Sequence, residues 1–340
     1  MKRILVTGGL GYIGSHTVVE LILRDYDVTV IDNLSNSEEK VLDGIESICG
    51  QRPKWIDLDL SDRSRCHDYL KNQKFDGIIH FAAFKAVGES VKKPLKYYMN
   101  NIFSLVNLLR YVEKNVNCAF IFSSSCSVYG EAKKLPITED SEIKSAESPY
   151  GNTKQICEEI IEESSVAYNL KSIALRYFNP IGADESGLIG EDPNGIPNNL
   201  MPFIAQVAVG KRPELSIFGN DYATEDGTCE RDYIHVTDLA HGHIAALNWL
   251  VKENKGLCEA FNLGTGTPYS VLKVLRSFEQ FTGVEVPFKF MPRRDGDLDA
   301  FWANADKATK KLNWTAKKSI KNMMEDTWRW QSNNPNGYDI

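Results

Sequence analysis

The stretch "VTGGLGYIGSH" (residues 6–16) decides the fold of this 340-residue chain. It lies after the apolar run "RILVT" (3–7), which predicts a strand, and it opens a helical stretch that runs to about Arg24. Two glycine patterns overlap in it, G-x-G-x-x-G and G-x-x-G-x-x-G, through Gly8, Gly9, Gly11 and Gly14. Glycines between a strand and a helix allow a tight turn and let the backbone approach a pyrophosphate at the helix N-terminus. The stretch therefore predicts a dinucleotide-binding strand–turn–helix unit.

The next predicted strand ends in an acidic residue. The run "DVTVI" (27–31) predicts that strand, and Asp32 follows it, 18 residues beyond Gly14. A carboxylate at this place accepts hydrogen bonds from a ribose and repels a 2′-phosphate, so it selects NAD over NADP. A phosphate-transfer P-loop is excluded, because no Gly-Lys-Ser/Thr follows the glycines. The sequence therefore predicts NAD as the cofactor.

Apolar runs alternate with helix-length segments through the first half of the chain. A helix is predicted from about Pro94 to Lys114, and further strands are predicted at "KWIDL" (54–58), "GIIHFA" (77–82), "AFIFSS" (119–124) and "SIALRY" (172–177). Strands that are apolar throughout imply a parallel sheet covered on both faces. With right-handed crossovers, this pattern predicts an α/β fold with a doubly wound, Rossmann-like parallel sheet.

The composition changes after Arg176. The segment "FNPIGADESGLIGEDPNGIPNN" (178–199) is rich in Gly, Pro, Asn and Asp and predicts a long structured loop. Helices are then predicted at about 200–210, 238–252 and 270–281, with short strands at 215–219 and 260–264. We interpret this half as a second, smaller mixed α/β domain. The predicted domains are 1–180 and 181–340, with an approximate boundary that leaves later segments free to rejoin the first domain.

The overall composition is that of a globular chain, with 42% hydrophobic and 25% charged residues. A net charge of −7 argues against a nucleic-acid-binding surface. The start "MKRILVTGG" has too short an apolar run for a signal peptide, and no run approaches the roughly 20 residues that span a bilayer. Seven scattered cysteines, none in a Cys-x-x-Cys pair, predict reduced thiols in the cytoplasm.

A tyrosine and a lysine open the predicted helix in "SPYGNTKQICEE" (148–159). Tyr150 and Lys154 are four residues apart, so their side chains are neighbours on a helix. A lysine beside a tyrosine favours the phenolate and lowers a pKa that is about 10 in a model peptide. When a Tyr-x-x-x-Lys spacing occurs without other motifs, the tyrosine is usually packed and the lysine is usually solvated. Here the serines of "FSSSCSVYG" (122–130) end a predicted strand, where ligands bind in such sheets. Serine, tyrosine and lysine together predict a proton-handling group beside the nicotinamide.

These features resemble the extended short-chain dehydrogenase/reductase superfamily. From residue 1 to about 330 the chain is similar to the UDP-galactose 4-epimerase family, in the blocks "GGLGYIGSHTVVELI", "IDNLSNS", "HFAAFKAVGESV", "SPYGNTK", "LRYFNPIGA", "NNLMPFIAQVAVGKR", "ERDYIHVTDLA" and "FNLGTGTPYSVL". The resemblance implies a reversible inversion at C4 that interconverts UDP-galactose and UDP-glucose in galactose metabolism. It implies a 4-keto intermediate and bound NAD that is regenerated in every turnover. It also implies a homodimer through two long helices and a UDP-sugar-binding role for residues 181–340.

The resemblance assigns the site residues as well. The catalytic residues would be Ser125, Tyr150 and Lys154, with Ser125 the third serine of "SSS". The cofactor contacts would be these three and Gly8, Gly11, Tyr12, Ile13, Gly14, Asp32, Asn33, Asn36, Ser37, Asp59, Leu60, Phe81, Ala82, Ala83, Lys85, Asn100, Tyr177 and Phe178. The UDP-hexose contacts would be Lys85, Ser125, Tyr150, Phe178, Asn179, Asn199, Leu200, Phe218, Arg231, Tyr233, Arg294, Asp297 and Phe301. No metal is implied.

Some of these substrate assignments carry chemical expectations. Arg231 and Arg294 would pair with the diphosphate in bidentate fashion, and Asp297 would hold the uridine ribose. Phe301 would form the wall of the sugar pocket that faces the C2 substituent. A rigid ring there would leave little room for a 2-acetamido group, which predicts a preference for plain hexoses. The alternative is that Phe301 belongs to the core, as most phenylalanines do.

Two rival functions share the fold and the cofactor. Nucleotide-sugar 4,6-dehydratases resemble one another in an Asp-Glu pair just after the serine, where this chain has Cys126 and Ser127. A non-catalytic redox-sensing regulator would need neither the tyrosine nor the serine, and this chain has both.

Other polar clusters predict no chemistry. His235, His241 and His243 diverge on a helix and have no carboxylate at metal-ligand spacing, so we interpret them as structural. The carboxylates of Glu158, Glu159, Glu162 and Glu163 predict a solvated helix face.

Overall fold

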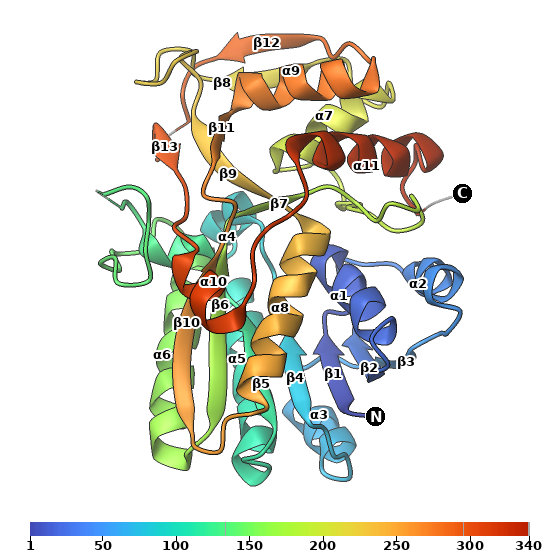
Figure 1. The fold of residues 1–340 in the computed structure, drawn as a ribbon, viewed down its shortest axis with the longest axis vertical. Coiled ribbons are helices and arrows are strands. Elements are labelled where there is room, and N and C mark those ends of the chain that lie inside the picture. Colours follow the sequence, from blue (N-terminus) through green and yellow to red (C-terminus); the bar gives the residue numbers. More distant parts are fainter. Residues whose placement is uncertain (133, 295, 339–340) are drawn as a thin grey trace.

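The computed structural model describes residues 1–132, 134–294 and 296–338. Its centre is a sheet of seven parallel strands in the order β10-β6-β5-β4-β1-β2-β3 (Figure 1). The strands are β1 (Arg3–Thr7), β2 (Asp27–Asp32), β3 (Lys54–Asp57), β4 (Gly77–His80), β5 (Ala119–Ser123), β6 (Lys171–Tyr177) and β10 (Leu257–Leu263). Because the strand order reverses between β1 and β4, the predicted doubly wound sheet is confirmed.

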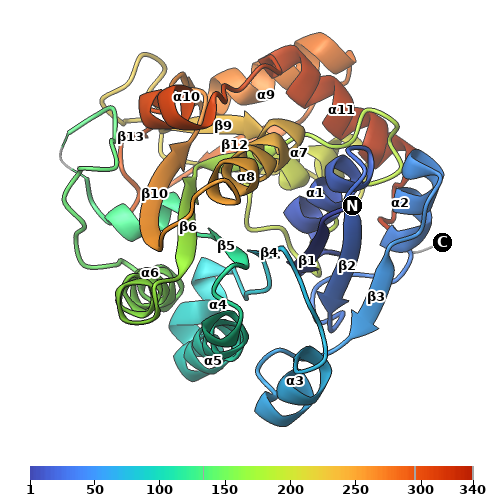
Figure 2. The same cartoon turned by 60° about the horizontal axis from the view of Figure 1, so that its bottom comes forward.

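Helices cover both faces of this sheet (Figure 2). One face carries α1 (Tyr12–Ile22), α2 (Val41–Cys49) and α8 (Val236–Leu250), and the other carries α3 (Arg63–Leu70), α5 (Pro94–Lys114) and α6 (Pro149–Tyr168). Successive side chains of a strand point to opposite faces of the sheet. Ile4 and Val6 therefore join one apolar core with α1 and α8, while Leu5 joins the other core with α5 and α6. This is why the strands are apolar throughout.

A smaller part of the structure lies beyond the carboxyl ends of the large sheet, at the top of Figure 1. It contains a mixed sheet of β7 (Asn179–Ile181), β9 (Glu230–His235), β11 (Pro268–Ser270) and β13 (Ala300–Phe301), and the pair β8 (Leu215–Phe218) and β12 (Phe288–Met291). Helices α7 (Leu200–Ala208), α9 (Val271–Thr282) and α11 (Ile320–Asn333) surround a third apolar core. The predicted smaller mixed α/β part is confirmed.

The chain crosses between the two parts more than once. After β9, helix α8 packs against α1, and β10 pairs in parallel with β6 at the edge of the large sheet. The short helix α10 (Asp306–Leu312) joins the same core. The strand predicted at 260–264 is therefore one of the later segments that rejoin the first domain. The boundary at residue 180 stays a prediction.

Short elements complete the fold: α4 (Val87–Lys92) and the 3-10 helix η1 (Cys126–Tyr129). The other predicted helices and strands are present, with ends shifted by a few residues. Residues 182–199 form turns and irregular backbone, as their composition predicted. Among the described residues, no helix has both the length and the apolar character to cross a membrane.

Candidate active site

A cavity lies at the carboxyl ends of β1, β2 and β4, beside the point where the strand order reverses. Except for Ser125 and Phe178, its lining contains every residue predicted to contact the cofactor: Gly8, Gly11, Tyr12, Ile13, Gly14, Asp32, Asn33, Asn36, Ser37, Asp59, Leu60, Phe81, Ala82, Ala83, Lys85, Asn100, Tyr150, Lys154 and Tyr177. Parallel strands bring their carboxyl ends to one edge of a sheet. Residues that are far apart in the sequence therefore share this one cavity.

The glycine-rich turn has a shape that side chains would prevent. Gly8 has a φ of +67°, and a Cβ on it would lie 2.7 Å from the backbone nitrogen of Ala82. A Cβ on Gly14 would lie 2.1 Å from the carbonyl oxygen of Gly8. Gly11 caps α1 without a side-chain hydrogen bond, and the first turn of α1 carries no acidic residue. The positive end of the helix is thus open to an anion such as a pyrophosphate.

Asp32 ends β2 as a fixed, buried carboxylate in the cavity wall. It accepts hydrogen bonds from the backbone N–H groups of Leu10 (3.0 Å) and Leu34 (3.1 Å) and from the hydroxyl of Ser37 (2.8 Å). Burial raises the pKa of Asp32, and these hydrogen bonds act in the opposite direction. A carboxylate held in this way fits the hydroxyls of an adenosine ribose. Together with the glycine turn, it makes the cavity suitable for NAD.

The start of α6 fixes the direction of the predicted catalytic side chains. The Ser148 hydroxyl accepts a hydrogen bond from the Gly151 N–H at 3.1 Å, and Pro149 occupies the first helical position. Both features are typical of helix N-termini, because they satisfy or remove donors that lack an intrahelical partner. Tyr150 and Lys154 therefore project from the first two turns of a capped helix, on the same face.

Tyr150, Lys154 and Ser125 lie together at the end of β5. The Lys154 ammonium donates a hydrogen bond to the Ser123 carbonyl oxygen at 2.7 Å and lies 6.0 Å from the centre of the Tyr150 ring. Tyr150 hydrogen-bonds to Ser125, and both Tyr150 and Lys154 line the cavity. Although Ser125 does not line the cavity itself, the structure brings the three residues predicted to be catalytic into one cluster.

The charges of this cluster differ from the sequence prediction. Burial raises the pKa of Tyr150 well above its ordinary value, and the hydrogen bond with Ser125 only partly opposes this. Burial also lowers the pKa of Lys154 to about 8. The expected lowering of the Tyr150 pKa is therefore not found for the protein's own groups, because burial is the largest cause of the shift and raises this pKa.

Several cavity residues were missed by the sequence analysis. These are Leu10, Ile31, Ser35, Glu38, Val41, Leu58, Phe84, Ser104, Gly190, Glu191, Asp192, Pro193, Asn194 and Tyr338. Six of the first eight lie next to predicted residues in the sequence, whereas Val41 and Ser104 lie four residues from the nearest predicted one. Residues 190–194 come from the predicted loop, where Glu191 forms an ion pair with Lys85 at 3.2 Å. Composition identified that loop but gave no sign that it forms a cavity wall.

The residues predicted to bind the uridine diphosphate form a second cluster outside the cavity lining. Arg294 donates to Asp297 at 2.8 Å, and Arg231 donates to the same carboxylate at 3.4 Å. The Arg294 guanidinium lies 5.0 Å from the centre of the Phe218 ring. Tyr233 is buried beside these charges. The structure thus gathers five predicted residues, although its two arginines share one carboxylate.

The remaining predicted substrate residues do not line the cavity and make other contacts. Phe178 and Phe301 are both buried, with ring centres 5.5 Å apart in a small apolar core. Asn179 donates to the Asp232 carbonyl oxygen at 3.0 Å. Asn199 and Leu200 begin α7, and the Asn199 side chain donates to Glu191 at 3.3 Å.

The prediction that the glutamates of α6 form a solvated face is wrong in part. Glu158 is not solvated: it forms a buried ion pair with Arg176 at 2.6 Å and accepts a hydrogen bond from the Ser124 hydroxyl at 2.5 Å. Glu159, Glu162 and Glu163 are exposed, as predicted. The three histidines are structural in the described chain, since His235 pairs with Asp326, His241 with Glu20, and His243 with the Leu239 carbonyl oxygen.

Comparison with known proteins identifies the family. The family model described as GDP-mannose 4,6 dehydratase matches residues 5–327. The chain is 51% identical to the UDP-glucose 4-epimerase of Bacillus subtilis (98% of each chain) and 49% identical to that of Haemophilus influenzae (98% of this chain, 99% of the other). The crystal structure of UDP-glucose 4-epimerase from Bifidobacterium longum in complex with NAD+ and UDP is 46% identical, with a TM-score of 0.93 over 98% of this chain and 99% of that chain. The chain belongs to the UDP-glucose 4-epimerase family, within the extended short-chain dehydrogenases/reductases.

Proposed function

We propose that this protein interconverts UDP-galactose and UDP-glucose by inverting C4, with NAD held in the cavity. The observation that carries the proposal is the position of Tyr150 and Lys154 in the wall of a cavity that also contains the glycine turn and Asp32. Relatives that share half of the sequence are named UDP-glucose 4-epimerases, which supports this substrate pair. The Bifidobacterium longum complex supports NAD and a uridine nucleotide as ligands.

The chain's own residues would handle the proton. When bound, NAD supplies the acceptor and donor of the hydride at C4. Tyr150 would remove the O4 proton as C4 is oxidised, which would leave a 4-keto sugar. Ser125 would orient O4 and share its proton, and Lys154 would add positive charge. After the 4-keto sugar turns about its diphosphate link, Tyr150 would return the proton to O4 as C4 is reduced on its opposite face, so no net oxidation would occur.

A 4,6-dehydratase activity is the weaker candidate. That reaction removes water across C5 and C6 and needs a second acid and base close to the sugar. The positions after Ser125 carry Cys126 and Ser127 instead of carboxylates. Burial raises the pKa of the Cys126 thiol to about 12, so it is a poor proton donor near neutral pH.

The second cluster would bind the uridine diphosphate. Arg231 and Arg294 supply two guanidinium groups, which suit the oxygens of a diphosphate. Asp297 already orients both groups, and Phe218 provides an aromatic face beside them. In this arrangement a diphosphate would share the arginines with Asp297, while the carboxylate accepts hydrogen bonds from the ribose.

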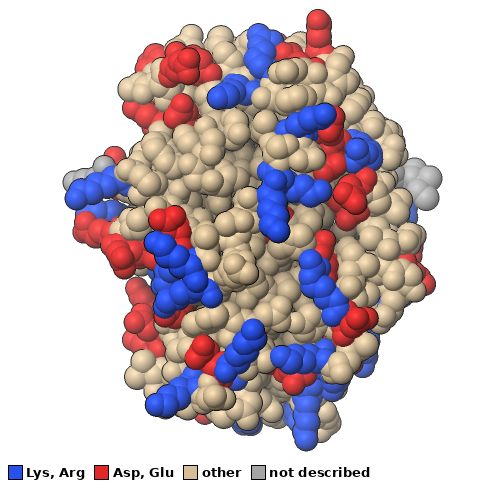
Figure 3. All heavy atoms as spheres, in the orientation of Figure 1, with Lys and Arg blue, Asp and Glu red and all other residues tan. Residues whose placement is uncertain are grey.

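The partners follow from the surface. The face in Figure 3 intersperses Lys and Arg with Asp and Glu, and together with the net charge of −7 this mixed pattern argues against nucleic acid or an anionic membrane surface as a partner. Two successive helices expose an apolar row, with Val87 and Val91 on α4 and with Leu95, Met99 and Phe103 at every fourth position of α5. This row supports a homodimer. The seven cysteines are all free, which supports a cytoplasmic location.

The decisive experiment is to incubate the purified protein with UDP-galactose, without added NAD, and to analyse the products. Appearance of UDP-glucose is the expected result. A 4-keto product that absorbs in the near ultraviolet after alkali treatment would favour the dehydratase. Absence of turnover, even with added NAD, would favour the non-catalytic regulator.

A further inference from the structure

The C-terminal segment folds back onto the 190–194 wall of the cavity. Tyr338 lines the cavity, and its N–H donates to the Asp192 carboxylate at 2.9 Å. The Tyr338 hydroxyl accepts a hydrogen bond from the Gly190 N–H at 3.2 Å and lies 3.5 Å from the Gly190 carbonyl oxygen. One tyrosine near the end of the chain therefore fixes a segment that lies almost half the chain earlier.

Helix α11 supports this tyrosine from behind. The ring of Trp330 is buried and lies 4.7 Å from the Tyr338 ring, centre to centre. The Trp330 indole N–H donates to the Glu191 carbonyl oxygen at 3.3 Å. A Cβ on Gly190 would lie 2.3 Å from the indole, so only glycine permits this approach. The 190–194 wall is thus packed against two aromatic rings.

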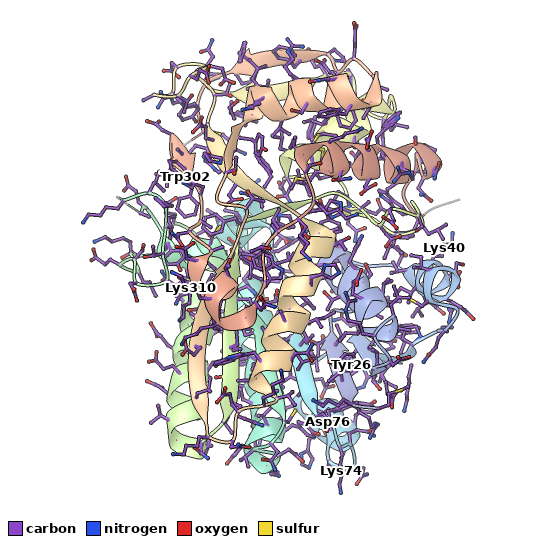
Figure 4. The ribbon with its side chains drawn as sticks, in the orientation of Figure 1. Tyr26, Lys40, Lys74, Asp76, Trp302 and Lys310 are labelled. Carbon is purple, nitrogen blue, oxygen red and sulfur yellow. The ribbon has the colours of Figure 1, made fainter. Side chains whose placement is uncertain are left out.

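Lys40 ties the same tyrosine to the opposite wall. Its ammonium donates to the Tyr338 carbonyl oxygen at 3.0 Å. Lys40 is exposed at the start of α2, whereas Ser37, Glu38 and Val41 around it line the cavity. Figure 4 shows Lys40 on α2, on the side of the molecule where the chain ends. The C-terminal segment therefore bridges the α2 side and the 190–194 side of the cavity.

We propose that Tyr338 and Lys40 are positioning residues that hold the cavity closed over NAD and retain it between turnovers. The proposal rests on the proposed function, in which NAD is regenerated at C4 and need not leave. Residues from both sides line the cavity, so a cofactor held there would contact both walls, and movement of either wall would loosen its hold. Contacts that tie the walls together lower the population of the open form and so slow the exchange.

The test compares the wild type with Tyr338→Phe, Tyr338→Ala and Lys40→Met, each purified as the full chain. One measurement is the rate at which bound NAD exchanges with radiolabelled NAD. A second is hydrogen exchange of the amides in residues 187–194, which needs no cofactor. Tyr26→Phe and Lys74→Met are matched controls. Tyr26 donates its hydroxyl proton to Asn248 away from the cavity lining, and Figure 4 shows both control residues in the lower part of the molecule.

Tyr338→Phe should speed NAD exchange roughly two- to tenfold, because one net hydrogen bond is lost. Tyr338→Ala also removes the ring contact with Trp330 and should speed exchange roughly 10- to 100-fold. Lys40→Met should speed exchange roughly two- to fivefold, while kcat at saturating NAD stays at the wild-type value. The amides of 187–194 should lose protection in the same order, and both controls should match the wild type.

Unchanged NAD exchange and unchanged amide protection in Lys40→Met and Tyr338→Phe would overturn the proposal. These two variants decide the matter even if Tyr338→Ala folds poorly, since Lys40 is exposed and phenylalanine keeps the ring. Failure of the proposed function has a different signature. In that case wild-type protein would not convert UDP-galactose, whereas the amide protection would still report whether the C-terminal segment closes the cavity.

Discussion

Tyr150 and Lys154 are both almost fully buried, and burial shifts their pKa values in opposite directions. With a pKa of about 8, Lys154 still carries its charge at neutral pH, whereas Tyr150 is neutral. The site therefore holds a cation and a phenol rather than a ready phenolate. A positively charged nicotinamide beside the ring would favour the phenolate. Proton removal would then be coupled to the presence of the oxidised cofactor.

Tyr150→Phe should abolish most epimerisation while the protein still binds UDP-sugar. A general base commonly contributes about 10² to 10⁴ in rate, and phenylalanine removes the hydroxyl without changing the ring. Steady-state kinetics and calorimetric titration with UDP-glucose would measure the two effects separately. A variant that retains a tenth of the wild-type kcat would contradict the assignment of Tyr150 as the base.

Lys154→Met should reduce kcat and also change how stability depends on pH. The folded pKa of Lys154 is about 8, below the value of about 10.4 for an unfolded chain. Between these values the unfolded state binds more protons, so the wild type gains stability relative to the variant as pH rises, and loses that gain as pH falls through 8. Urea unfolding of both proteins across this window measures the difference. A difference that does not vary with pH would contradict a depressed pKa.

Phe301→Ser should bring the catalytic efficiencies for UDP-galactose and its N-acetylated counterpart closer together. Phe301 packs against Phe178, the predicted floor of the sugar site, so its ring is both core and a candidate pocket wall. Overpacking typically costs about 1–3 kcal/mol, which predicts roughly 10- to 100-fold discrimination in kcat/KM by the wild type. The check is kcat/KM for both sugars on both proteins. Equal kcat/KM values of the wild type for the two sugars would show that Phe301 packs in the core and does not select between substrates.

At the scale of elements, sequence patterns predicted the helices, strands and turns whose formation depends on neighbouring residues. The strands of the large sheet, the helix α5 and the glycine turn each follow from a run of neighbouring residues. The place of β10 at the sheet edge does not, because its partner β6 lies some eighty residues earlier and pairing is set by the whole fold. The same limit applies to Tyr338 and the 190–194 wall, which are brought together only by tertiary packing.

The prediction that Glu158 is solvated failed for a different reason, because the spacing along the helix already indicated that this residue is buried. It lies four residues after Lys154 and eight after Tyr150, on the face that carries both buried residues. The sequence analysis treated the four glutamates of α6 as one group and therefore assigned Glu158 to the exposed face of its neighbours. The predicted catalytic and cofactor residues were found because the resemblance assigns them a role, whereas it assigns none to Glu158 or to its partner Arg176, although Arg176 lies in the block "LRYFNPIGA".

Glu158→Gln should destabilise the fold strongly. The side chains of Glu158 and Arg176 are only 12% and 8% exposed, so the substitution would leave a guanidinium buried without its counter-charge. Removing one partner of a buried ion pair typically costs about 3–5 kcal/mol of unfolding free energy. Urea unfolding measures the loss, and Glu159→Gln on the exposed face of the same helix is the matched control. Equal stability of the two variants would show that the pair contributes little.

At the scale of the molecule, the apolar row on α4 and α5 lies at the side of the sheet that α5 and α6 cover, and Figure 2 shows these helices at the periphery of the fold. Leu95 and Val91 are 74% and 61% exposed, which is unusual for neighbouring large apolar side chains on a monomer. A two-fold axis along such a row would pack the same residues of both copies against each other. None of the five row residues lines the cavity, although Asn100 and Ser104 on α5 do, so each copy would keep its own cavity lining.

Leu95→Glu should convert the proposed dimer into a monomer. The substitution would place two unpaired carboxylates at the centre of an apolar interface, where their desolvation is strongly unfavourable. Leu95 does not line the cavity, so the monomer should still contain NAD. Light scattering after gel filtration measures the mass, and Leu23→Glu, at a 55% exposed leucine that follows α1 on the opposite face of the sheet, tests whether any apolar-to-acidic change has the same effect. Wild-type protein that elutes as a monomer, or a Leu95→Glu variant that stays dimeric, would place the subunit contact elsewhere or remove it.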